Sequence, residues 1–108
     1  MPRKRSLDRE TISRIAARTI VVPYVTKIGP LVDRAVFLET IASHRPERHP
    51  DLRREAAMLA DGAREDLRHF NLQVEGVPVL VAEQPSIEDT RRALVAVVER
   101  FERALLSL

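Results

Sequence analysis

The chain contains no cysteine, which excludes disulfide bridges, thiolate metal sites and cysteine nucleophiles. Tryptophan is also absent, and one tyrosine and three phenylalanines are the whole aromatic content, so stacking platforms for nucleic-acid bases are scarce. The three glycines lie far apart, so there is no glycine-rich phosphate loop or dinucleotide-binding motif. These absences disfavour a small-molecule enzyme, and we expect neither a cofactor nor a metal site.

Long hydrophobic runs are missing as well. The longest apolar stretch, "IVVPYV", is too short to span a bilayer, and the charged opening "MPRKRSLDRE" is unlike a signal peptide. We therefore expect a cytoplasmic protein that does not contact a membrane. The 108 residues predict a single domain.

Positive charge gathers at the N-terminus. Residues 1–18 hold six basic and two acidic residues, a local charge of +4, whereas the whole chain carries +2. Residues 1–5 are expected to form a flexible basic arm. The candidate residues for binding nucleic-acid phosphates are Arg3, Lys4, Arg5, Arg9 and Arg14. A solvated terminus with no partner fits the same charges.

Apolar residues recur at helical spacing in four segments, which predicts a mainly α, four-helix bundle-like domain. The first segment covers residues 6–18. An interruption is expected over residues 19–26, because "TIVVPYVT" is rich in β-branched residues and contains Pro23. Gly29 and Pro30 then mark the start of a second helix that ends near His44.

The third helix is predicted from Pro50 to about Phe70, and the fourth from Ser86 to the C-terminus. In the fourth, the 4-3-4 spacing of Leu94, Val98, Phe101 and Leu105 gives an apolar face that is wider than one helix contact needs. This face lines either the core or a contact with another copy.

Between these helices, "LQVEGVPVLVAEQP" (residues 72–85) departs from the helical pattern. Its valines favour strands, and "EGVP" has the composition of a turn, so a small β-hairpin is predicted near residues 72–83. An extended connection packed on the bundle is the alternative. A lone hairpin is marginal in water, so Val79 and Val81 need cover from this chain or from another copy.

Arg64 and His69 enclose four residues in "REDLRH", a spacing that resembles the Arg-x4-His pattern of HEPN-type ribonucleases. That resemblance implies an all-helical domain in which Arg64 stabilises phosphoryl charge and His69 transfers a proton. Glu65 departs from the family pattern, because its negative charge opposes a phosphate. A histidine near the end of a helix also explains His69 without catalysis.

Two further patterns in the sequence do not predict a function. The opening "RKRSLDRETI" resembles the start of tetracycline-repressor-type regulators, but no helix-turn-helix follows in register. The loop "HRPERHP" and the aspartate after it offer metal-capable side chains, yet their spacing crosses Pro46 and Pro50 and fits no ligand signature.

The sequence thus favours a non-enzymatic interaction or assembly module that forms a homodimer or a higher homo-oligomer. The candidate interface residues are Val79, Val81, Leu94, Val98, Phe101 and Leu105. A regulatory protein that binds nucleic acid through the basic N-terminus is one alternative, and a HEPN-like ribonuclease is the other.

Overall fold

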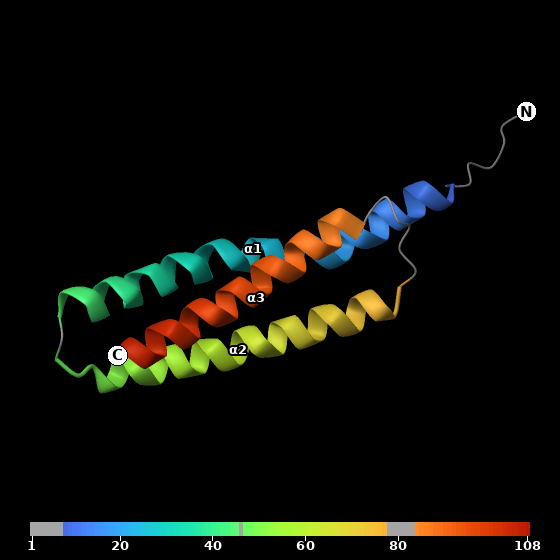
Figure 1. Cartoon of the computed structure of the whole chain (residues 1–108). Helices are drawn as coiled ribbons and strands as arrows, with labels where there is room; N and C mark the ends of the chain where they lie inside the picture. Colours follow the sequence, from blue (N-terminus) through green and yellow to red (C-terminus); the bar gives the residue numbers. More distant parts are fainter. Residues whose placement is uncertain (1–7, 46, 78–83) are drawn as a thin grey trace, which may run out of the picture.

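The fold is described from a computed structural model, which describes residues 8–45, 47–77 and 84–108. They form three helices: α1 (Arg9–His44), α2 (Pro50–Glu75) and α3 (Gln84–Ser107). Helices α1 and α3 run in the same direction and α2 runs in the opposite one, which makes an elongated bundle of 73 × 21 × 19 Å (Figure 1). The mainly α prediction is confirmed. The prediction of four helices is wrong, and no strand occurs in the described part of the chain.

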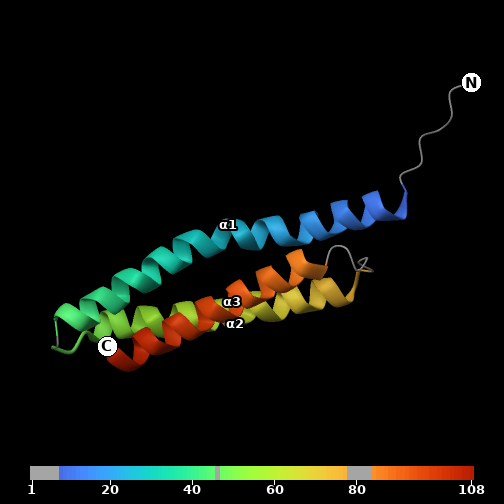
Figure 2. The same ribbon diagram turned by 45° about the horizontal axis from the view of Figure 1, so that its top comes forward.

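The predicted break between the first two helices does not exist, because α1 continues through Pro23 and Pro30. Both prolines are exposed and lie seven residues apart on one face, so the carbonyls that they leave without a helical partner are on the solvent side. On the other face, Ile20 and Tyr24 are buried against the bundle. This packing offsets the cost of the prolines, and the helix bows along its length (Figure 2).

The predicted hairpin is also wrong in its first strand, because Leu72 and Val74 belong to the last turn of α2. Val74 continues the apolar face of α2 and packs against the core, so tertiary contact overrides its preference for strands. The Gly76 N–H closes the helix by donating to the Leu72 carbonyl at 3.1 Å. Val79 and Val81 lie outside the described residues.

The core consists of two clusters along the bundle. One surrounds Leu38 and Phe101 and is rich in alanines, which allow the helices to approach closely. The other contains Ile20, Tyr24 and Phe70 near the start of α3. There the rings of Tyr24 and Phe70 meet edge to face, with centroids 5.2 Å apart. The N-terminal half of α1 therefore depends on a different set of contacts from its C-terminal half.

A bidentate ion pair joins α1 to α2. Both Arg34 Nε and Arg34 Nη2 donate to the carboxylate of Glu55, the latter at 2.6 Å. The hydrogen bonds from Arg34 lower the pKa of Glu55. A carboxyl whose pKa is lower in the folded state adds stability at neutral pH, and this stability is lost as the pH falls through the folded-state pKa.

We expect Glu55→Gln to lower the free energy of unfolding at pH 7 by about 1 kcal/mol, because one half of a partly exposed pair is removed. The difference between wild type and variant should shrink as the pH falls through the lowered folded-state pKa of Glu55, because the wild-type carboxyl is then protonated. Urea unfolding at pH 7 and pH 3 measures both values. Glu99→Gln, on the exposed side of α3, is the control. A difference that does not change with pH would contradict the role given to the ion pair.

Candidate interaction surface

Exposed apolar side chains are concentrated on α1. Of the nine large hydrophobic residues that are exposed in the described chain, six belong to this helix. Ile12 and Ile15 are each 52% exposed, and Val25 is 53% exposed. The other three are Val22, Val36 and Phe37. Because α2 and α3 pack on the opposite face of α1, these side chains are not buried by another helix of the described bundle.

The exposed residues follow a regular spacing, and we call this face the outer stripe. Its positions alternate at three and four residues, the pattern of a helix-pairing seam. All of them are exposed. The outer stripe consists of Ile12, Ile15, Thr19, Val22, Thr26, Gly29, Asp33 and Val36. Val25 and Phe37 lie beside it. The stripe is apolar or small except at Asp33.

Helix α1 is consequently apolar on two opposite faces. Among the described helices it is the one whose length and composition match a membrane-crossing helix, with a mean hydropathy of 1.3 over 18 residues. Only 17% of that window is buried in the bundle. The outer stripe is therefore an apolar surface that the described bundle leaves open.

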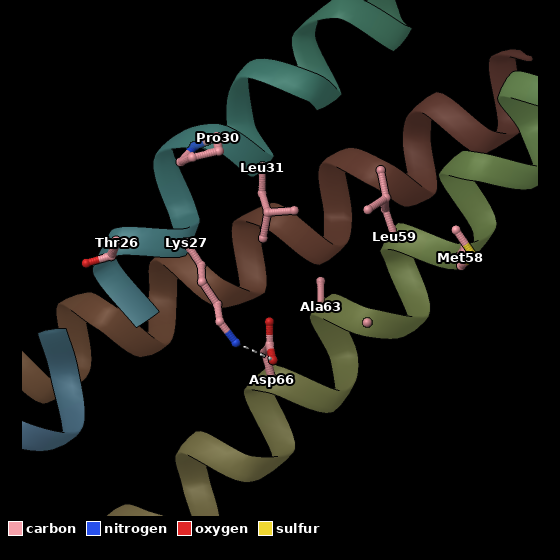
Figure 3. A pocket seen from close by; sticks show the side chains of 9 residues that line it. Thr26, Lys27, Pro30, Leu31, Met58, Leu59, Ala63 and Asp66 are labelled. Atoms are coloured by element: carbon pink, nitrogen blue, oxygen red, sulfur yellow. Dashed lines mark ion pairs between the residues drawn. The ribbon is translucent and has the colours of Figure 1, made fainter. Parts of the chain in front are cut away.

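A groove of about 470 Å³ runs beside the outer stripe, between α1 and α2 (Figure 3). Leu31 of α1 and Leu59 and Ala63 of α2 line it. Lys27 reaches across from α1 to Asp66 of α2, with 3.5 Å between Nζ and Oδ1 (Figure 3). Thr26 belongs both to the groove and to the outer stripe, so the two features form one continuous surface.

The predicted interface residues that the structure describes lie in the core of this chain or against it. Leu94, Val98 and Phe101 are buried in the core of this chain, and Leu105 is half-buried against it. Val79 and Val81 lie outside the described residues. The wide apolar face of α3 is therefore covered by α1 and α2, and most of the large hydrophobic side chains that remain exposed in the described chain belong to α1.

Arg64 and His69 do not form a joint site within the chain. Five residues of α-helix turn the two side chains about 140° apart. Arg64 forms ion pairs with Asp61 at 2.6 Å and with Glu102 at 3.6 Å. His69 lies 3.1 Å from Glu65. These acidic neighbours oppose the approach of a phosphate, and the ribonuclease alternative stays an untested prediction.

The basic residues of the predicted nucleic-acid site are only partly described. Arg9 and Arg14 are exposed on the first turns of α1, which project beyond α2 and α3 (Figures 1 and 2). Arg3, Lys4 and Arg5 lie outside the described residues. This alternative also stays a prediction.

The metal-capable side chains around the first interhelical loop have local partners. His44 Nδ1 lies 2.9 Å from the Thr40 carbonyl, and His49 Nε2 lies 3.0 Å from the Arg45 carbonyl. The described residues contain no group of three or more side chains placed to hold a metal ion.

The outer stripe was not identified from the sequence, because its pattern crosses the interruption that Pro23 predicted. Ile12, Ile15 and Val22 carry the signal, but it emerges only when residues 9–44 are treated as one helix.

Searches among protein-family models, curated proteins and solved structures gave no match to this chain. The functional conclusion therefore depends on the geometry alone.

Proposed function

We propose that this protein is a non-enzymatic assembly module that associates with copies of itself through the outer stripe of α1. The observation that supports the proposal is the exposure of six large apolar side chains along one helix whose opposite face is already packed. Isolated exposed hydrophobic residues are normal, whereas a continuous apolar surface marks an interaction site. From Ile12 to Val36 the stripe extends about 36 Å along the helix.

A bilayer is a less suitable partner than a second copy. Asp33 lies within the outer stripe and Arg18 lies beside it, both exposed. A charged side chain at the centre of a bilayer costs about 2.5–3.5 kcal/mol. At a protein interface, each charge can instead approach an opposite charge. The same stripe therefore suits a protein seam better than lipid.

The contact is narrow, because a single helix is only about 10 Å wide. Small interfaces are weak in general, so we expect a high dissociation constant and association only at high protein concentration. Solution mass should therefore be measured from about 1 µM to about 1 mM, which covers binding free energies of about −8 to −4 kcal/mol. We expect the mass to rise above the 12.3 kDa of one copy across this range.

Val22→Lys is expected to raise the dissociation constant about 100-fold, because a charge without a partner enters the apolar seam from each copy, at a total cost of roughly 2.8 kcal/mol. Val22 is half-exposed on the surface of α1, so the fold of one copy should be unaffected. Sedimentation equilibrium gives the dissociation constant, and circular dichroism checks the fold.

Leu106→Lys is the matched control, because it makes the same charge change at an exposed leucine of α3 away from the outer stripe. This control variant should associate as the wild type does. The proposed function is rejected if the wild type stays a single copy at about 1 mM, or if both lysine variants weaken association equally. Absorbance at 260 and 280 nm on the same samples reports nucleic acid, which would favour the basic N-terminus instead.

A further inference from the structure

We propose that two copies pair through their outer stripes in antiparallel orientation, with the two-fold axis level with residue 24. This inference rests on the proposed self-association and specifies its geometry. In this register, positions whose numbers add to 48 face each other across the seam. Ile12 then faces Val36, Thr19 faces Gly29, and Val22 faces Thr26 of the second copy.

The sizes of the stripe residues support this register. Every position of the outer stripe has a counterpart at the same distance from residue 24, so the surface is complementary to itself, as a two-fold contact requires. Thr19 meets a glycine and Val22 meets a threonine. At the centre of the seam, the glycine of each copy therefore lies against a larger side chain of the other copy. In-register parallel pairing would instead place Gly29 against Gly29 and leave a gap there.

Charge favours the antiparallel orientation more strongly than side-chain size does. Asp33 is the single ionisable residue of the outer stripe, and no ion pair involves its side chain in the described part of the chain. Parallel pairing brings Asp33 against its own copy, a like-charge contact inside a partly dry seam. Antiparallel pairing places Asp33 opposite Ile15 and within one helical turn of Arg18 of the second copy. Arg18 is exposed and also has no ion pair among the described residues.

The shape of the bundle agrees with this arrangement. The first turns of α1 project beyond α2 and α3 (Figures 1 and 2), and Ile12 and Ile15 in this part of the helix are each 52% exposed. In antiparallel pairing these turns lie over the C-terminal half of α1 of the second copy, which its own α2 and α3 support. Each copy thus covers the outer face of the projecting turns of the other.

Engineered disulfides test the orientation cleanly, because the chain has no cysteine of its own. Thr19→Cys and Gly29→Cys are each prepared alone, one with a tag that changes its mass, and then mixed and oxidised. A side chain at residue 29 meets no atom within 4 Å, so the variant should fold. We expect a mixed disulfide between the two variants. Thr19→Cys alone should cross-link poorly, since its two copies lie about 15 Å apart along the axis and a disulfide needs about 7 Å or less.

The outcomes separate the two proposals. Self-cross-linking of Thr19→Cys would show parallel pairing and overturn this inference. Association of the wild type without any mixed disulfide would overturn the register and leave self-association intact. A wild type that never associates would reject the proposed function itself.

A charge exchange provides a second, independent measurement. Asp33→Arg should raise the dissociation constant about fivefold, because it places a second positive charge within one helical turn of Arg18 of the second copy. The double variant with Arg18→Asp should recover the wild-type constant, because the opposite charges are restored with their places exchanged. In parallel pairing each charge meets its own kind, so the double variant would stay weak and the antiparallel inference would fail.

Discussion

Replacing Phe101 by alanine is expected to lower the free energy of unfolding by about 3–5 kcal/mol. Phe101 is 0% exposed and lies in the alanine-rich cluster with Leu38 and Val97, where all three helices meet. Removing the ring takes away its burial and leaves a cavity, because the small neighbours cannot fill the space. A domain of this size has a total stability of about 5–15 kcal/mol, so the variant should be partly unfolded at moderate temperature.

Urea titration followed by circular dichroism at 222 nm measures this loss, since the described fold is almost wholly helical. Leu106→Ala is the control on the same helix, because Leu106 is 84% exposed. The control should change stability by less than about 0.5 kcal/mol. Equal effects of the two substitutions would mean that Phe101 is not buried in the protein in solution.

Phe70→Ala is expected to cost a similar amount, about 3–5 kcal/mol, but with a different pattern along the chain. Phe70 belongs to the second cluster, which holds the N-terminal half of α1 through Ile20 and Tyr24. The variant also loses the edge-to-face contact with Tyr24. Hydrogen exchange should therefore accelerate more in residues 9–28 than in residues 31–44, which pack on the other cluster.

Tyr24→Phe is the matched control for this cluster. It keeps the ring beside Phe70 and removes only the hydroxyl, which donates to Oε1 of Gln73 at 2.7 Å. The expected cost is about 0.5–1.5 kcal/mol. If Phe70→Ala accelerated exchange evenly along all of α1, the two clusters would act as a single cooperative unit and the proposed division of the core would be wrong.

The last helix was the most predictable part of the fold. The spacing of Leu94, Val98 and Phe101 correctly indicated a continuous buried face. Such a pattern is local, because each position depends only on residues three and four away. Whether that face packs within the chain or against another copy depends on the distant helices that cover it. The spacing of apolar residues along one helix does not indicate which of the two occurs.

The errors arose where a local preference opposed a tertiary contact. Pro23 and Pro30 predicted a break, but the burial of Ile20 and Tyr24 on the opposite face keeps α1 continuous. Val74 predicted a strand, but its contact with the core keeps it helical. The outer stripe was missed for the same reason, because its regular spacing is apparent only after the break is removed.

The described part of the chain has three helices, an odd number, which determines where its two ends lie. Helix α1 begins at one end of the bundle and α3 finishes at the other, so the two ends of the folded part leave in opposite directions (Figure 1). The 36 residues of α1 alone extend about 54 Å. Sequences fused to the two ends would therefore be held apart at opposite ends of the bundle.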